Sequence, residues 1–201
     1  STAENNGIDW SGASAWIKGA EDWTAAISAV EAPSAPAYFR APFHAYPEGN
    51  LCWEAAFEQE LAGKAVGLRN FPVREGGLEG ERRFRGSFDT ALHGTGVAIP
   101  AGATIVDLGC GTGTSTRRLA AMFPEAEHII GIDLSPHMVA VGRRLLEGVG
   151  GREVEEWIEP VQPDPRVRLL AADAAHTGLA DSSADLVSLC LVLHELPGEA
   201  A

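Results

Sequence analysis

The spacing of apolar residues predicts two amphipathic helices near the start of the chain. Apolar side chains from Trp16 to Val30 recur at intervals of four and three, which places them on one face of a helix over 14–30. Pro33 ends this pattern. A second pattern of the same kind predicts a helix over 51–68. Its apolar face consists of Trp53, Phe57 and Leu61.

The rest of the first hundred residues also indicates helices and loops. Asn50 is a candidate N-cap for the helix over 51–68. Residues 70–83 are rich in Gly, Glu and Arg, which is typical of a surface loop. A short helix is expected next, with Phe84, Phe88 and Leu92 along one side. We therefore expect residues 1–99 to form a helical N-terminal cap or lid region.

After Pro100 the pattern changes to short apolar runs that alternate with helical segments. The expected strands are 104–108, 128–134, 167–172 and 185–193, and the expected helices are 114–123 and Ser135 to about Glu147. Ser135-Pro136 is a typical helix start, because Ser can cap and Pro fits the first turn. Residues 152–166 are acidic and contain Pro, which indicates an insertion or linker. Alternating strands and helices predict an α/β fold over 100–201, a doubly wound, Rossmann-like parallel sheet.

A glycine-rich turn joins the first of these strands to the helix after it. Its glycines are Gly109, Gly111 and Gly113, and a turn in this position typically binds a nucleotide or an anion. The dinucleotide fingerprint is GxGxxG, and here Thr114 stands where its third glycine would be. The spacing therefore disfavours a pyrophosphate-containing cofactor.

Two aspartates sharpen this interpretation. Asp107 closes the first strand beside the turn, where a carboxylate repels a pyrophosphate and attracts a cation. Asp133 ends the second strand, where a carboxylate can accept hydrogen bonds from both hydroxyls of a ribose. Each aspartate could instead be a helix-capping or turn residue. Together with the turn, the pair favours a cationic nucleoside such as S-adenosylmethionine over NAD.

These segments resemble, in order, the motifs of class I S-adenosylmethionine-dependent methyltransferases. Residues 105–113 are similar to motif I, and residues 131–138 are similar to the second motif. Residues 172–174 fall where that family places an acid near adenine, and residues 179–187 are similar to the stretch that leads into motif IV. The resemblance covers about residues 100–198. Residues 41–54 also resemble an uncharacterised plant and algal branch of the family.

The resemblance implies a role for each matched residue. Gly109, Gly111 and Gly113 would present their backbone to the methionine moiety of the donor, and Asp107 would hold its ammonium group. Asp133 would bind the ribose. Leu134 and Met138 would lie against the adenine and Asp173 would bind the adenine amino group, with further donor contacts at Ala174 and Leu191. Core packing is the alternative for Met138, and capping of a helix over 174–178 is the alternative for Asp173.

The acceptor side offers fewer candidates. His194 follows the fourth strand and is the candidate general base, or else a residue of the site wall. The other histidines and the cysteines show no metal-ligand spacing, so no metal is expected. Cys110, inside the glycine turn, is interpreted as a small filling residue rather than a nucleophile.

Composition limits the partners. The formal net charge is −13, with 28 acidic and 15 basic residues, so nucleic acid is not an expected substrate. No apolar run approaches the roughly 20 residues that span a bilayer. The three cysteines are far apart and the chain does not begin with a signal-peptide pattern, so reduced thiols in the cytoplasm or a plastid stroma are expected.

The leading hypothesis is methyl transfer from S-adenosylmethionine to a small-molecule acceptor. The resembled family has further strands after motif IV, so the sheet is expected to be incomplete at its C-terminal side, with an exposed edge. This expectation keeps a second hypothesis open, a non-catalytic S-adenosylmethionine-binding module. An NAD-dependent oxidoreductase is the third, disfavoured by Asp107 and the glycine spacing. The sequence contains no indication of oligomeric state.

Overall fold

The computed structural model describes residues 10–19, 22–43, 46–71, 79–147 and 163–198. The chain divides into two compact units. The first unit, which we call the helical unit, comprises residues 1–21, 57–98 and 147–163, and the second, the sheet unit, comprises residues 22–56, 99–146 and 164–201. Residues 22–56 thus cluster with the sheet, and the boundary at 99 drawn from the sequence stays a prediction. The linker expected at 152–166 lies largely outside the described residues.

The helical unit contains α1 (Trp10–Gly19), most of α3 (Trp53–Asn70) and α4 (Glu79–Gly94). Its apolar core consists of Ala13, Leu61 and Leu68, with Trp10 packed against them. α3 and α4 cross in close contact, because a Cβ at Gly67 would lie 2.5 Å from the Cα of Glu81. α3 confirms the helix predicted over 51–68.

Two predictions in this part of the chain were wrong. The single helix over 14–30 is two helices, α1 and α2 (Trp23–Ser28), and the side chain of Asp22 caps α2. The loop predicted over 70–83 is wrong from residue 79 on, because α4 begins there. The charged residues that indicated a loop form ion pairs one helical turn apart. These pairs are Arg83–Glu79 and Arg85–Glu81.

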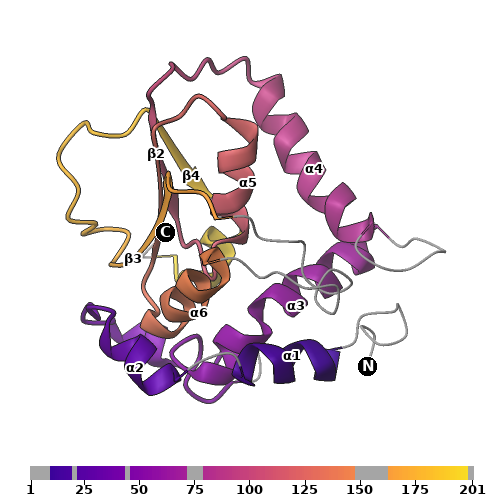
Figure 1. Ribbon diagram of the computed structural model, residues 1–201, viewed down its shortest axis with the longest axis vertical. Coiled ribbons are helices and arrows are strands. Elements are labelled where there is room, and N and C mark those ends of the chain that lie inside the picture. The colour runs from indigo at the N-terminus through magenta and orange to yellow at the C-terminus, as the bar shows by residue number, and fades with distance from the viewer. Residues whose placement is uncertain (1–9, 20–21, 44–45, 72–78, 148–162, 199–201) are drawn as a thin grey trace. The chain divides into compact units, whose positions relative to one another are not determined.

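The sheet unit is built on four parallel strands in the order β3-β2-β1-β4. Three of them, β2, β3 and β4, are labelled in Figure 1. The strands are β1 (Thr104–Leu108), β2 (His128–Asp133), β3 (Val167–Ala171) and β4 (Leu186–Leu189). The chain steps outward from β1 to β3 and then returns to the other side of β1. This reversal is the switch point at which open α/β sheets bind ligands, beyond the carboxyl ends of β1 and β4. The predicted doubly wound, Rossmann-like class is confirmed.

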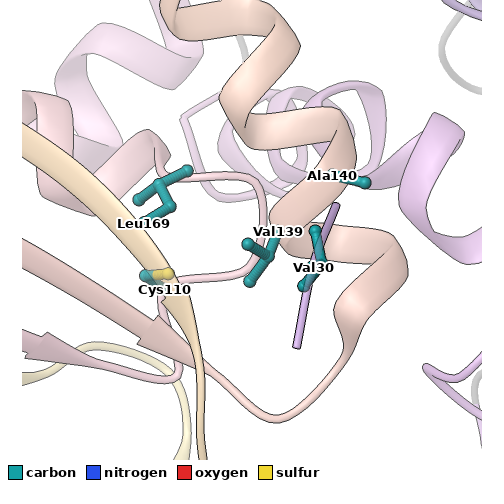
Figure 2. Close-up of a cluster of buried hydrophobic side chains, with 5 residues drawn as sticks. All are labelled: Val30, Cys110, Val139, Ala140 and Leu169. Atoms are coloured by element: carbon teal, nitrogen blue, oxygen red, sulfur yellow. The ribbon is translucent and has the colours of Figure 1, made fainter. Parts of the chain in front are cut away.

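Helices α5 (Thr114–Met122) and α6 (Pro136–Leu146) pack on one face of this sheet. Leu169 of β3 and Val139 of α6 meet there with Cys110 and Val30 in a buried cluster (Figure 2). On the opposite face, a second buried cluster consists of Val106, Ile130 and Ile132. Apolar residues of the segment after β3 pack against this cluster. Alternating strand residues thus bury both faces of the central strands.

β4 is an edge strand and is shorter than the 185–193 expected from the sequence. It ends before Leu191, whose φ of 60° is left-handed and incompatible with continuing a strand. Val187 and Leu189 are about half exposed, at 50% and 44%. A short 3-10 helix, η3 (Leu193–Glu195), follows. None of the helices in the described ranges is long and apolar enough to cross a membrane.

Candidate functional site

The glycine turn leaves β1 at the switch point and enters α5. Gly109, Gly111 and Gly113 have φ values of 71°, 55° and 91°, all in the left-handed region that only glycine adopts readily. The amides of Gly109 and Cys110 both donate to the carbonyl of Ile132, at 2.7 and 3.0 Å. The turn is therefore fastened to the end of β2, and its glycines are required by backbone geometry.

The absence of a side chain at Gly109 also permits a close contact. A Cβ there would lie 2.3 Å from Cγ2 of Val192, in the segment after β4. Cys110 is buried in the cluster of Figure 2, and burial raises the pKa of its thiol well above the usual value. A buried, protonated thiol is a poor nucleophile. The geometry supports the interpretation of Cys110 as a filling residue.

Asp107 lies beneath the glycine turn and is fully buried. Its Oδ2 accepts hydrogen bonds from the hydroxyls of Ser115, at 2.6 Å, and Thr116, at 2.7 Å. Both hydroxyls belong to the first turn of α5, whose amino-terminal end favours a negative charge. Asp107 thus places negative charge under the turn, while its predicted contact with a donor ammonium stays a prediction.

Asp133 is held by two backbone amides. Oδ2 accepts from the amide of Gly111 and Oδ1 accepts from the amide of Ser135, both at 2.8 Å. The pKa of Asp133 is raised to about 6, mainly by burial and in smaller part by the charges of Glu195 and Asp107, while the two amides oppose the shift. A carboxylate with one amide on each oxygen retains acceptor positions for two more donors. This is the arrangement that a ribose with two hydroxyls requires.

The neighbours of Asp133 form the start of α6. Ser135 caps this helix, because its Oγ accepts from the amide of Met138 at 3.3 Å. Met138 is 5% exposed and Leu134 is half-buried. The burial of Met138 is compatible with core packing and with a flat apolar contact to a base, so both alternatives for Met138 stay open.

At the end of β3, Asp173 lies in a turn. Its Oδ1 accepts from the amide of Ala175 at 2.9 Å, and its Oδ2 lies 3.5 Å from Nδ1 of His176. No helix begins here, so the alternative that Asp173 caps a helix over 174–178 was wrong. Ala174 is exposed, and the proposed adenine contacts of both residues stay predictions.

The segment after β4 carries the candidate base. His194 lies on η3 with its side chain 58% exposed, and its Nε2 is 3.9 Å from Oε1 of Glu195. Burial raises the pKa of Glu195, opposed by the charge of His194 and by a hydrogen bond from Asn50. The two side chains approach each other because residues 193–195 form a helical turn, whereas the sequence predicted a strand up to residue 193.

Sequence reasoning missed several residues that the structure brings to this edge. Ser115 and Thr116 hold Asp107, and their position one turn after the glycines was the available signal. Asn50 was interpreted as the N-cap of the next helix, which was wrong. α3 begins at Trp53, and the side chain of Asn50 donates instead to Glu195, 145 residues later.

The charge of this edge fits a cationic ligand better than a phosphate. Asp107 and Asp133 lie at the ends of β1 and β2, and Asp173 and Glu195 follow β3 and β4. The sequence has no Lys or Arg over 105–116, 129–142 or 169–198, and the guanidinium of Arg117, directly after the first of these ranges, donates to the carbonyl of Thr112 in the turn at 3.2 Å. Left-handed glycines and buried carboxylates are the features that a nucleoside sulfonium would use. Within the described ranges, no group of three or more His, Cys, Asp or Glu is placed to hold a metal ion.

Comparison with known proteins agrees with this geometry. Residues 105–201 match the family described as methyltransferase domain. A trans-aconitate 2-methyltransferase of Methylobacterium nodulans is 45% identical over 78 residues, which are 39% of this chain and 29% of the relative. A demethylmenaquinone methyltransferase of Clavibacter sepedonicus is 36% identical over 100 residues, 50% of this chain and 34% of the relative. The chain thus spans about a third of the length of these relatives.

Among solved structures, YcgJ protein from Bacillus subtilis is 21% identical, with a TM-score of 0.36 over 51% of this chain and 37% of that chain. The strand order establishes the fold without this likeness. The named relatives are methyltransferases, which does not favour the nicotinamide alternative, and the plant and algal branch stays a prediction. Residues 105–201 of the chain are similar to the methyltransferase domain family and to these methyltransferases.

Proposed function

We propose that this chain binds S-adenosylmethionine at the carboxyl edge of its sheet and transfers the methyl group to a small-molecule acceptor. The observation that carries the proposal is the pair of hydrogen bonds on Asp133. They fix a half-buried carboxylate to the glycine turn on one side and to the start of α6 on the other. The surrounding charges are acidic, which suits a donor that carries a sulfonium and an ammonium group.

Each residue of the edge has a defined task in this proposal. Asp133 accepts hydrogen bonds from the ribose hydroxyls. Gly109, Gly111 and Gly113 let the methionine moiety lie against the backbone. Asp107, held by two hydroxyls, supplies negative charge beneath that moiety. The residues assigned to the adenine are Leu134, Met138, Asp173, Ala174 and Leu191.

The donor supplies an already activated methyl group on its sulfonium. The chain therefore has to align the acceptor with that methyl group and to exclude water. A base is needed only for an acceptor that must lose a proton, and His194 is then the candidate. Its exposed ring beside Glu195 can take up a proton and pass it to solvent.

The relatives support the donor half of the proposal more than the acceptor half. Trans-aconitate and demethylmenaquinone, the acceptors in their names, are chemically unrelated. Proteins with such different acceptors share this segment, so we assign the segment to the common donor.

Titration calorimetry with S-adenosylhomocysteine tests the donor site, with NADH as the comparison ligand. We expect binding of S-adenosylhomocysteine by the folded full chain and none of NADH. Folded protein that binds no S-adenosylhomocysteine would contradict the proposal. Transfer of label from methyl-labelled donor to small molecules of a cell extract tests catalysis, and binding without any transfer would support the non-catalytic module instead.

A further inference from the structure

A tight turn before α3 brings Asn50 to the donor edge. The amide of Gly49 donates to the carbonyl of Tyr46 at 3.1 Å, and Gly49 has a left-handed φ of 58°. A Cβ at this glycine would lie 2.6 Å from the carbonyl oxygen of Ala41. The turn therefore has little freedom, and the residue that follows it is held in a defined place.

Asn50 contacts two loops that the sequence separates widely. Its backbone carbonyl accepts a hydrogen bond from Oγ of Ser135 at 2.7 Å. Its side-chain Nδ2 donates to Oε2 of Glu195 at 3.2 Å. Ser135 also donates its backbone amide to Asp133, the residue proposed to bind the ribose. Ser135 therefore links Asn50 to Asp133. One residue thus joins the ribose turn to the segment after β4.

Aromatic packing fixes the same turn to α6. The ring of Trp53 meets His137 edge-on, with centroids 4.7 Å apart, and lies 5.4 Å from the ring of Trp23. His137 belongs to the first turn of α6, two residues after the cap residue Ser135. The contact of Asn50 with Ser135 is therefore part of a packed corner and not an isolated surface bond.

The segment after β4 has unfavourable features that a stabilising contact can offset. Glu195 is 28% exposed in its side chain and repels Asp133, since its charge contributes to the raised pKa of that residue. The same segment carries Leu191 in a left-handed conformation, which is unfavourable for leucine. It also places Val192 against Gly109 of the glycine turn. The repulsion between Glu195 and Asp133 and the strained backbone of Leu191 both disfavour this position of the segment. The hydrogen bond from the side-chain amide of Asn50 to Glu195 favours it.

We propose that Asn50 is a positioning residue for the donor, because it clasps Glu195 and so holds the segment after β4 against the glycine and ribose turns. Asn50 would act through Glu195 and Ser135 rather than by touching the donor. The inference rests on the proposed donor site, and it extends that site to a segment that precedes the sheet by more than 50 residues.

An exchange of partners tests the clasp. N50D places a second carboxylate against Glu195, and we expect the affinity for S-adenosylhomocysteine to fall about tenfold, the effect of losing one hydrogen bond to a charged group. E195Q keeps an acceptor for Asn50 and should change the affinity less than about threefold. The double variant N50D/E195Q restores a carboxylate–amide pair with its direction reversed. It should recover the affinity to within about threefold of the wild type.

Two further variants separate positioning from general damage. N70D makes the same chemical change at an exposed asparagine whose Nδ2 donates to the carbonyl of Val66, and it should leave the affinity unchanged. E195A removes the clasp from the other side and serves if N50D does not fold. Melting temperatures without ligand show how far each change affects stability alone.

Three results would overturn the inference. Wild-type affinity in N50D and E195A would show that the clasp does not position the donor site. A double variant that regains its melting temperature but not its affinity would assign Asn50 a structural role only. A folded wild type without affinity for S-adenosylhomocysteine would remove the proposed function, and the clasp with it.

Discussion

Both units of this protein bury carboxylates, but they hold them by different means. In the helical unit, Glu81 is 5% exposed and pairs with Arg85 at 3.0 Å. In the sheet unit, Asp107 is held by two hydroxyls and Asp133 by two backbone amides. The first arrangement sets a guanidinium beside the carboxylate, while these hydrogen bonds to the two aspartates come from neutral donors.

This difference separates a structural carboxylate from one suited to a ligand. A buried acid with a guanidinium partner is compensated within the fold, and losing either partner leaves an uncompensated charge. Buried acids held by dipoles keep their field, which attracts a cation to the edge of the sheet. We therefore expect changes at the α3–α4 crossing to alter stability, and changes at the sheet edge to alter ligand affinity.

D133N should have the largest effect on affinity. It removes the charge and leaves one of the two backbone amides without its acceptor, so hydrogen bonds to both ribose hydroxyls weaken. At about 1.5 kcal/mol or more for each, the affinity for S-adenosylhomocysteine should fall about 100-fold. Calorimetry measures it, and a loss below threefold in folded protein would refute the role of Asp133.

The reverse pattern is expected at Glu81. R85Q removes the guanidinium that opposes the raised pKa of the buried Glu81, and it should lower the free energy of unfolding by about 1–3 kcal/mol in urea. The affinity of the folded protein should stay within twofold of the wild type. R83Q is the matched control, because the Arg83–Glu79 pair has side chains 59% and 46% exposed and should contribute under about 0.5 kcal/mol. Equal losses in the two variants would contradict the comparison.

Glycine-to-alanine changes distinguish the glycine turn from an ordinary helix. G109A forces alanine to a φ of 71° and against Val192, so it should cost about 1–2 kcal/mol of stability and weaken donor binding. G86A, inside α4 where an added Cβ meets no atom within 4 Å, should instead stabilise by about 0.5–1 kcal/mol. Chemical unfolding of both variants measures the difference, and a stabilising G109A would show that the turn is misplaced.

Acid should weaken ligand binding and strengthen the fold. Asp133 has a pKa of about 6, so below that pH it becomes protonated and the affinity for S-adenosylhomocysteine should fall by up to about tenfold per pH unit. D133N should show no such dependence. A pKa raised above the ordinary value of 3.8 means that the protonated form is the one stabilised by folding. This stabilisation is fully present below about 3.8 and is lost as the pH rises through about 6.

The melting temperature without ligand should therefore be higher at pH 5.5 than at pH 7.5. The raised pKa values of Glu81 and Glu195 act in the same direction. A melting temperature and an affinity that both fall with acid would contradict the raised pKa of Asp133.

Local sequence patterns predicted most of the strands and helices of the sheet unit. β1 has the predicted bounds, because an apolar run followed by glycines determines where that strand ends. α6 begins as Ser135-Pro136 indicated, because the cap is a local interaction. The long helix over 14–30 was wrong because Gly19 and the capping Asp22 interrupt an apolar pattern that itself continues.

The features that local patterns missed depend on contacts between distant residues. β4 ends early because of the left-handed Leu191, whose segment packs against Gly109. Asn50 and Glu195 are 145 residues apart, and no spacing in the sequence joins them. The start of α4 was misjudged because charged residues were interpreted by composition rather than by their four-residue pairing. The sequence therefore predicted the glycine turn and the aspartates that the structure places at the carboxyl edge of the sheet, but not what holds the segment after β4 in place.

Nuclear magnetic resonance of the labelled full chain, titrated with S-adenosylhomocysteine, tests the central claim most directly. The account predicts that the largest amide shifts occur at Gly109, Gly111, Gly113 and Ser135. The amides of α4 around Glu81 should not move. Shifts concentrated in the helical unit, or no shifts in a folded sample, would contradict a donor site at the carboxyl edge of the sheet.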